Sequence, residues 1–284
     1  YYVAKYGNLT KAAHVLGNSQ PNITRAMNCL ESEIRCTLFI RTNRGVRLTP
    51  EGERLYTRVS AAMAQLQLAE EELTDSTGLE HGSISIGASE TALSIYLLER
   101  LKHFHMTYPN IRLKIYNHST PQAVHSVKNG EIDFAIVTTP TTAKPPLKEI
   151  RLESFREVLV GGKTFTALSS QTLTLAELKN YPLICLGRET MTFAFYHQLF
   201  LSHGLELEPD TEAATTDQVL PLVKSDLGLA FIPESMAIPA IQNHEVIPIH
   251  LQETIPCRYV CMVSDIKRPL NSAARKLKDL ILHS

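Results

Sequence analysis

The side chains best suited to recognising nucleic acid lie between residues 19 and 25. The amides of Gln20 and Asn22 can each form two hydrogen bonds with adenine, and the guanidinium of Arg25 can pair with guanine or hold a phosphate. The Thr24 hydroxyl suits a phosphate oxygen. If the segment is helical, these groups would face the DNA major groove from the start of one helix. The candidate contacts are Ser19, Gln20, Pro21, Asn22, Thr24 and Arg25.

A second group of basic side chains lies in residues 38–48. Asn43 to Gly45 form the turn of a predicted hairpin that is flanked by apolar residues, which is typical of a winged helix-turn-helix. A single arginine here is often better explained as a solvated surface charge. A group of three on one hairpin favours contacts with the DNA backbone or minor groove. These arginines are Arg41, Arg44 and Arg47.

The charge of the chain is divided unevenly. Residues 1–58 hold nine Lys and Arg residues against four acids, a net of +5. The remaining residues hold 19 bases against 25 acids, a net of −6. A basic N-terminal segment followed by an acidic remainder indicates a DNA-binding head attached to a second domain. The alternative is that a short segment differs in charge by chance.

Two short helices must position the candidate base contacts. The first is predicted over residues 10–16 and ends at Gly17-Asn18. The second begins at Ser19, a good N-cap, with Pro21 in the first turn, where a missing N–H has no cost. The apolar stripe of the second helix consists of Ile23, Met27 and Leu30. Two helices joined by a tight turn predict a helix-turn-helix.

A long helix is predicted over residues 50–78. Thr49 and Pro50 form a helix start, and neither Gly nor Pro occurs between Gly52 and Gly78. Apolar residues follow at alternating spacings of four and three, as in a coiled-coil seam. The seam consists of Leu55, Val59, Ala62, Leu66, Ala69 and Leu73. A helix packed on its own domain is the alternative, but the narrow stripe favours pairing with a second copy.

After residue 78 the pattern changes to strands alternating with helices. Strands are predicted over residues 83–87, 111–116, 133–137, 157–160, 183–186, 229–232, 246–249 and 259–263. Helices are predicted over residues 91–106, 121–129, 193–203, 217–225 and 271–282. This alternation indicates α/β layers with mainly parallel sheets.

Several classes of protein are disfavoured by the sequence. The five cysteines form no paired CxxC units and the eleven histidines are dispersed, so we expect neither a metal site nor a disulfide framework. Cys185 and Cys261 lie in predicted strands and should be buried, inert thiols, although peroxide sensing by a thiol pair stays open. No apolar run could span a membrane. The first residues do not show the basic-then-apolar pattern of a leader, and because the sequence begins at Tyr1 without Met, we expect the natural N-terminus to be missing.

The order and spacing of these motifs resemble the LysR-type transcriptional regulators. In the first 52 residues the resemblance rests on Val3-Ala4-x-x-Gly7, Ala12-Ala13-x-x-Leu16, Ser19-Gln20-Pro21, Leu30-Glu31, Leu38-Phe39-x-Arg41 and Leu48-Thr49-x-x-Gly52. Further along it rests on Gly82-x-Ile84-x-Ile86-Gly87, Tyr108-Pro109, Gly130-x-Ile132-Asp133-x-Ala135-Ile136 and Gly228-Leu229-Ala230-x-Ile232-Pro233. The resemblance covers almost the whole chain.

The resemblance implies an α/β protein with an all-α winged helix-turn-helix head, a long linker helix and a two-lobed effector domain like a periplasmic binding protein. The implied domains are residues 1–49, 50–78 and 79–284, with lobe one over 82–157 plus 258–284 and lobe two over 158–257. In this family effector contacts cluster at strand ends that open helices. The residues implied at such positions are Ser89, Glu90, Thr91, Thr138 and Thr216.

Arg35 departs from the family pattern, which usually has Gly just past the second helix. Gly at that position takes a positive φ and ends the helix. An Arg in the same conformation costs roughly 1 kcal/mol, unless the helix ends differently here.

Together these patterns predict a cytoplasmic, sequence-specific DNA-binding regulator controlled by a small organic acid or amino acid. It would act as a homodimer, and as a homotetramer by resemblance, without cofactor, metal or membrane attachment. A periplasmic-type solute-binding protein is the alternative, and the helix-turn-helix argues against it. An α/β enzyme would need a nucleophile with its base, a metal set or a phosphate loop, and Ser169-Ser170 lacks the G-x-S-x-G context of a hydrolase.

Overall fold

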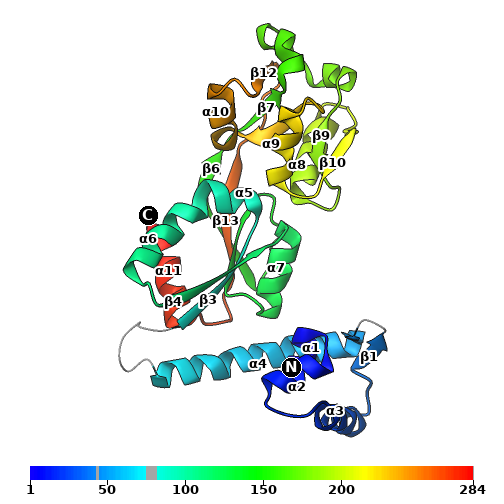
Figure 1. Cartoon of the computed structure of the whole chain (residues 1–284), viewed down its shortest axis with the longest axis vertical. Helices are drawn as coiled ribbons and strands as arrows, with labels where there is room; N and C mark the ends of the chain where they lie inside the picture. The colour runs from blue at the N-terminus through cyan, green and yellow to red at the C-terminus, as the bar shows by residue number, and fades with distance from the viewer. Residues whose placement is uncertain (43–44, 75–81, 284) are drawn as a thin grey trace. The chain divides into compact units, whose positions relative to one another are not determined.

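A computed structural model describes residues 1–42, 45–74 and 82–283 of the chain. The chain divides into two compact units, residues 1–76 and residues 77–284, each with its own elements (Figure 1). The head unit contains α1 (Tyr2–Tyr6), α2 (Leu9–Val15), α3 (Gln20–Ile34), β1 (Phe39–Thr42), β2 (Gly45–Leu48) and α4 (Pro50–Thr74).

The head is the predicted winged helix-turn-helix. The Asn8 side chain accepts a hydrogen bond from the Lys11 N–H at the start of α2, and the Ser19 hydroxyl accepts one from the Asn22 N–H at the start of α3. The predicted N-cap of the second helix is therefore confirmed. The small core consists of Val3, Ala12, Ala13 and Ile23, with Met27, Phe39 and Val46 packed against it.

Two polar side chains fix the hairpin and the long helix in the head. One carboxylate oxygen of Glu31, in α3, accepts hydrogen bonds from the N–H groups of Leu38 and Phe39 at 2.6 and 3.0 Å. The Thr49 hydroxyl donates to the Thr37 carbonyl at 2.7 Å and accepts from the Gly52 N–H at 3.0 Å. A Cβ at Gly52 would collide with the Leu38 carbonyl, so Gly permits this close approach of α4 to the hairpin.

Helix α4 begins where Thr49 and Pro50 predict it. Of the seam positions, Leu55 and Val59 are half-buried, whereas Leu66 keeps 59% of its surface exposed. The side chains of Ala69 and Leu73 lie outside those described. An exposed leucine in the second half of a long helix leaves apolar surface available to a second copy.

Arg35 does adopt the strained conformation that its position predicts. Its φ and ψ are 52° and 40°, in the left-handed region, and the Cys36 N–H donates to the Glu31 carbonyl at 3.1 Å to close the helix end. Helix α3 therefore ends as it would with Gly, and the arginine retains the strain.

Replacing Arg35 with Gly should stabilise the head by about 1 kcal/mol, because it removes this strain. Hydrogen exchange of the α3 amides in the full chain should then slow by about fivefold. The control is Arg58→Gly inside α4, which should destabilise by about 1 kcal/mol. Equal or faster exchange in Arg35→Gly would show that the helix end is unstrained.

The second unit consists of two α/β lobes. One lobe has a five-stranded sheet in the order β4-β3-β5-β13-β6. Its elements are β3 (Gly82–Ala88), α5 (Glu90–Ala92), the π-helical turn η1 (Leu93–Leu97), α6 (Leu98–Thr107), β4 (Ile111–Asn117), α7 (Thr120–Asn129), β5 (Phe134–Thr138), β6 (Leu147–Phe155), β13 (Arg258–Asp265) and α11 (Ser272–His283).

Helices cover both faces of this sheet, with α7 on one face and α6 and α11 on the other (Figure 1). Strand β5 is buried along its whole length for this reason. Phe134 and Ile136 join the core beneath α6 and α11, whereas Ala135 and Val137 pack with α7. The uninterrupted apolar run of β5 is what a strand covered on both faces requires.

The other lobe has a four-stranded sheet in the order β11-β7-β12-β8 and a parallel pair, β9 with β10. Its strands are β7 (Glu157–Gly161), β8 (Thr172–Leu173), β9 (Ile184–Leu186), β10 (Thr211–Ala213), β11 (Ala230–Pro233) and β12 (Ile247–Leu251). Its helices are η2 (Lys163–Ser170), η3 (Leu175–Asn180), α8 (Met191–Ser202), α9 (Thr216–Lys224) and α10 (Glu234–Gln242). The chain passes between the lobes at β6–β7 and again at β12–β13.

The expectation of mainly parallel sheets is wrong. Strand β3 is parallel to β4 and β5, but β13 is antiparallel to both β5 and β6. In the other lobe β7 is antiparallel to β11 and β12. In the first lobe the physical reason is that the chain leaves after β6 and returns through β13, so the returning strand enters the sheet from the opposite end. In the second lobe β7 carries the chain in and β12 carries it out, so these two neighbouring strands run in opposite directions.

Several elements were not expected from the sequence. Strand β6 has exposed charged residues at four of its positions, which obscure its apolar pattern; they are Lys148, Glu149, Arg151 and Glu153. Helix α10 contains Pro239, which would normally argue against a helix. The 3-10 helices η2 and η3 lack a 3.6-residue period, so periodicity does not reveal them.

Candidate functional site

The predicted base-contacting residues lie at the exposed start of α3. Gln20, Asn22 and Arg25 are exposed, and Thr24 is half-buried. The Gln20 amide donates to the Thr24 hydroxyl at 3.2 Å, and the Asn22 amide donates to the Asn18 side chain at 3.0 Å. These contacts hold both amides on the helix surface with further donor and acceptor capacity. Ser19 and Pro21 are exposed at the same helix start.

The wing places its arginines on opposite faces. Ile40 pairs with Arg47 and Arg41 pairs with Val46, so Arg41 and Arg47 alternate across the two-stranded ribbon. Both are exposed, and neither has a carboxylate partner within the described part of the head. Arg44 lies outside the described residues. A ribbon with cations on both faces can contact the two sides of one groove.

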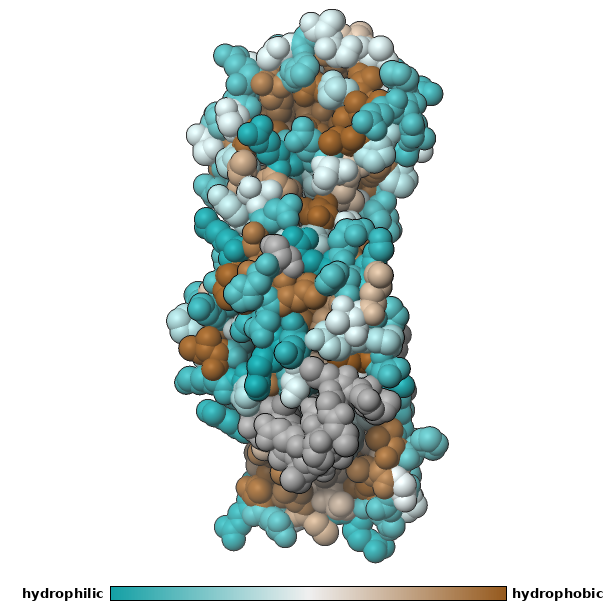
Figure 2. Space-filling view, turned by 90° about the vertical axis from the view of Figure 1, so that its left-hand side faces the viewer, coloured by the Kyte–Doolittle hydropathy of each residue, from teal (hydrophilic) through white to brown (hydrophobic). Residues whose placement is uncertain are grey.

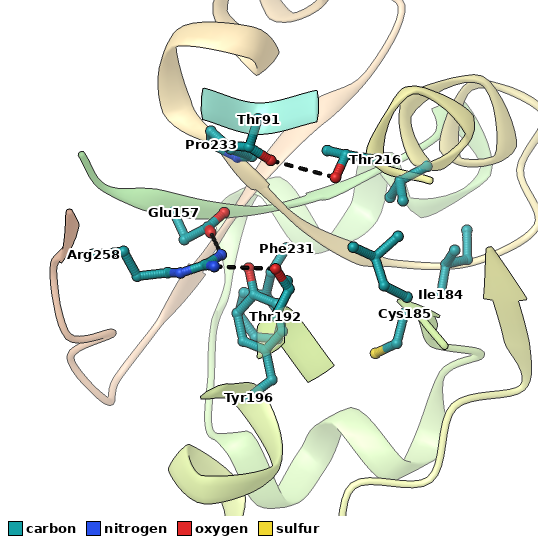
Figure 3. A pocket seen from close by; sticks show the side chains of 12 residues that line it. Thr91, Glu157, Ile184, Cys185, Thr192, Tyr196, Thr216, Phe231, Pro233 and Arg258 are labelled. Carbon is teal, nitrogen blue, oxygen red and sulfur yellow. Dashed lines mark hydrogen bonds and ion pairs between the residues drawn. The ribbon is translucent and has the colours of Figure 1, made fainter. Parts of the chain in front are cut away.

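A second candidate site lies between the two lobes. A pocket with a volume of about 20 Å³ is lined by side chains from both lobes and from the two crossings (Figure 3). Space of this size accommodates about one water molecule, so a larger ligand requires the lobes to separate. The lining residues are Thr91, Glu157, Ile184, Cys185, Leu186, Thr192, Tyr196, Thr216, Val219, Phe231, Pro233 and Arg258.

A buried ion pair forms the polar end of this pocket. Arg258, the first residue of β13, lies 2.6 Å from a carboxylate oxygen of Glu157, the first residue of β7, and both side chains are 1% exposed. Because these residues stand at the two chain crossings, the pair joins the hinge strands. Charged side chains are buried this deeply only when they are paired.

Arg258 is also held by uncharged neighbours. Its Nη2 donates to the hydroxyls of Thr138 and Thr192 at 2.8 and 3.0 Å, and its Nε donates to the Thr139 carbonyl at 3.0 Å. The guanidinium lies 5.4 Å from the ring centroid of Phe155 and 5.1 Å from that of Phe195. Such contacts supply the stabilisation that a desolvated guanidinium needs.

Two polar atoms in the same pocket make no hydrogen bond of good geometry with the described residues, although the second lies close enough to the Glu157 carboxylate to interact with it. They are Oε2 of Glu157 and the hydroxyl of Tyr196, both shielded from solvent. Burial, followed by the nearby Glu157 carboxylate, raises the pKa of Tyr196 well above its usual value. Tyr196 therefore stays a neutral hydroxyl at physiological pH, able to donate or accept.

The structure brings together three of the five predicted effector residues. The Thr91 hydroxyl donates to the Thr216 hydroxyl at 3.3 Å across the pocket, and Thr138 reaches the site through Arg258. Ser89 accepts from the Ala92 N–H as a helix cap, and Glu90 accepts from Asn117 at 3.3 Å. Neither of these last two lines the pocket, and the effector role of all five residues remains a prediction.

Four polar pocket residues were missed at the sequence level. Thr192 and Tyr196 lie on the first two turns of α8; Tyr196 is inside the predicted helix, and Thr192 immediately precedes its predicted start. The sequence positions of Glu157 and Arg258 could have identified them as site candidates, because each is a charged residue that begins a strand at a predicted lobe crossing. Their sequence separation of 101 residues hides the pairing.

The expected burial of the two strand cysteines is confirmed. Burial raises the pKa of Cys185 to about 12, and burial together with Glu149 raises the pKa of Cys261 to about 12. Both thiols are therefore protonated near neutral pH and react slowly. Within the described ranges, no group of three His, Cys, Asp or Glu residues could hold a metal ion. No helix in these ranges is long and apolar enough to cross a membrane.

Comparisons with known proteins match both units of the chain. Residues 1–53 match the family described as "Bacterial regulatory helix-turn-helix protein, lysR family", and residues 77–284 match the "LysR substrate binding domain". The HTH-type transcriptional regulator YofA of Bacillus velezensis is 27% identical over 248 residues, which are 87% of this chain and 83% of YofA.

Solved structures are similar in fold. A full-length OxyR variant from Pseudomonas aeruginosa has a TM-score of 0.74 over 99% of this chain and 90% of its own, at 18% identity. The effector binding domain of QuiR, solved in complex with shikimate, has a TM-score of 0.63 over 72% of this chain and 96% of its own, at 18% identity.

The alternative of a solute-binding protein does not account for the matched helix-turn-helix. The two family matches together cover the head and both lobes. The chain therefore belongs to the LysR family, and it is a DNA-binding transcriptional regulator with an effector-binding domain.

Proposed function

We propose that a small organic acid or amino acid, bound in the pocket between the lobes, controls transcription by this regulator. The observation that carries the proposal is the pocket itself, which is lined from both lobes and from both chain crossings. In QuiR, a fold relative, the corresponding domain was solved with shikimate, a small organic acid.

Occupation of this pocket would act through the angle between the lobes. A ligand shifts a conformational equilibrium only if it binds one arrangement more tightly than the other. Thr91 and Thr216 come from different lobes and meet across the pocket. A ligand placed between these threonines contacts both lobes in only one arrangement of the lobes. Because it would bind that arrangement more tightly, it would bias the regulator toward one DNA-bound state.

Thr216→Trp tests the pocket directly. The indole would fill the space between the lobes, so genes controlled by the wild-type chain should stop responding to growth conditions, while the protein stays on its promoters. Transcript sequencing and chromatin immunoprecipitation in a strain that carries the variant measure both effects. The chain contains no tryptophan, so the fluorescence of the new indole also reports whether it is buried.

Thr172→Trp is the matched control, because Thr172 is an exposed threonine of the same lobe outside the pocket. It should leave regulation intact. Unchanged regulation in Thr216→Trp, with its indole buried, would rule out the pocket as the effector site.

We also propose that α3 reads bases and that the wing holds the DNA backbone. Gln20→Ala should cost roughly 1–3 kcal/mol on the operator and little on random DNA, because it removes a base-edge contact. Arg47→Ala should weaken binding to all duplexes and lower the salt slope by about 1, because it removes a phosphate contact. Fluorescence anisotropy at several salt concentrations separates the two effects. Equal weakening of both duplexes by Gln20→Ala would contradict its base-reading role.

The remaining expectations belong to the same proposal. The regulator would act in the cytoplasm, where bacterial DNA lies, and would not catalyse a reaction. It would form a homodimer through α4 and a homotetramer through the effector units.

Apolar side chains gather in patches among polar ones on the surface (Figure 2). Leu98 and Met106 of α6 are 52% and 76% exposed, which supports a further contact there.

A further inference from the structure

We infer that the two lobes hold each other closed through their own side chains, and that the effector acts by parting them. The inference rests on the proposed function and deepens it, because it adds the direction in which the effector moves the lobes. Two polar contacts between the lobes carry the inference, and together they are called the clasp. They join Arg258 to Thr192 and Thr91 to Thr216 (Figure 3).

The first half of the clasp is a guanidinium that lobe one anchors and lobe two accepts. On the side of lobe one, Arg258 donates from Nε to the Thr139 carbonyl at 3.0 Å and from Nη2 to the Thr138 hydroxyl at 2.8 Å. On the side of lobe two, the same Nη2 donates to the Thr192 hydroxyl of α8 at 3.0 Å. The Phe195 ring of α8 lies 5.1 Å from the guanidinium. One charged group therefore ties α8 to the end of β5.

The second half of the clasp joins the starts of two helices. The Thr91 hydroxyl of α5 donates to the Thr216 hydroxyl of α9 at 3.3 Å, and Thr91 is 4% exposed. Around this contact α9 packs against α5, and α10 packs against η1. The two hydroxyls meet directly, so their hydrogen bond exists only while the lobes are together.

Closure by these contacts leaves little room for a ligand. The pocket has a volume of about 20 Å³. Its polar groups interact with one another, since the Tyr196 hydroxyl contacts the Glu157 carboxylate and Arg258 neutralises that carboxylate. A molecule larger than water therefore enters only after the lobes part, and it replaces the clasp contacts with its own. Effector binding then favours a more open arrangement, and a stronger clasp lowers the apparent affinity for the effector.

Alkylation of a cysteine at position 91 measures how often the lobes part. Thr91 is buried and contacts lobe two, so Thr91→Cys should react with N-ethylmaleimide mainly while the lobes are open. Adding Thr192→Val removes an acceptor from Arg258 and leaves its ion pair in place. The alkylation rate of Thr91→Cys should then rise about tenfold. Peptide mass spectrometry of the full-length chain, with no candidate effector added, resolves each cysteine.

Three controls separate parting of the lobes from other effects. Thr192→Ser keeps the hydroxyl and should leave the rate unchanged. Thr172→Val makes the same change at an exposed threonine of lobe two outside the pocket and should also leave it unchanged. Cys261 is buried in β13 outside the pocket, so its own rate reports unfolding of lobe one. Equal rates in Thr192→Val and Thr192→Ser, or a parallel rise at Cys261, would overturn the inference.

Transcription gives the direction of the effect. An opened clasp imitates the bound effector, so a strain that carries Thr192→Val should keep one transcript level across growth conditions. Thr216→Trp should fix the same level, because an indole exceeds a pocket of about 20 Å³ and holds the lobes apart. If the two variants fix opposite levels, or if Thr192→Val opens the lobes and still responds as the wild type does, the effector does not act by parting them.

The outcomes also separate this inference from the proposed function. The alkylation rates involve no effector, so they test the clasp whatever the pocket binds. Regulation by Thr216→Trp that matches the wild type, with the indole buried, would remove the effector role of the pocket. A tenfold rise in alkylation in the same set of experiments would still show that the clasp holds the lobes closed.

Discussion

Replacing Arg258 with Met is expected to lower the free energy of unfolding of the effector unit by about 3–5 kcal/mol. Both side chains of the pair are 1% exposed, so the variant leaves the Glu157 carboxylate buried and unpaired. It also removes a donor from the Thr138 and Thr192 hydroxyls and from the Thr139 carbonyl. The lobes should separate more easily, because the pair links the two hinge strands.

Thermal unfolding followed by circular dichroism measures this loss, which should appear as a fall in Tm on the order of 10 °C. Arg112→Met is the control, because Arg112 is an exposed arginine of β4 and its loss should change stability by less than about 0.5 kcal/mol. The double variant Arg258→Met, Glu157→Leu should recover most of the loss, since it removes both charges. An unchanged Tm in Arg258→Met would show that the pair does not stabilise the hinge.

Leu66→Glu is expected to convert the proposed dimer to monomers. Leu66 is 59% exposed on α4, so its apolar surface is free to pack against a second copy. A glutamate at the seam would bury an unpaired charge in that interface. A monomer carries one DNA-binding head, whereas the dimer carries two that bind the same operator. The monomer should therefore bind the operator about 100-fold or more weakly, because binding of the second head is no longer intramolecular.

Analytical ultracentrifugation measures the oligomeric state. Leu66→Met keeps an apolar side chain and should stay dimeric, and Arg58→Glu places an acid on an exposed position of the same helix outside the seam. A Leu66→Glu protein that sediments like the wild type would mean that the copies pair through another surface.

Local signals in the sequence were sufficient to predict where the helices of the head begin and end. Ser19 caps α3 and Thr49 begins α4 where their residue types predict, because caps act on backbone groups within the same turn. Arg35 takes the positive φ that its position indicates, since the geometry of the helix end is also local. The buried strand β5 was predictable because its apolar run has no alternation.

Strand direction and the pocket pair depend on distant parts of the chain. Nothing local to residues 258–265 indicates that β13 runs antiparallel to β5, because that direction follows from the return of the chain through the hinge. Arg258 meets Glu157 across 101 residues for the same reason. The hydroxyls of Thr91 and Thr216 were predictable from strand ends, but their mutual contact depends on how the lobes close.

The most direct test of the central claim is selection of binding sites by the full-length chain from a pool of random duplexes. A dimer with two heads imposes its own two-fold symmetry on the site. The selected duplexes should therefore share an interrupted inverted repeat, and the chain should bind it at least about a thousandfold more tightly than random DNA at physiological salt. If selection enriches no common sequence, and all duplexes bind equally, the chain would not be a sequence-specific DNA-binding regulator.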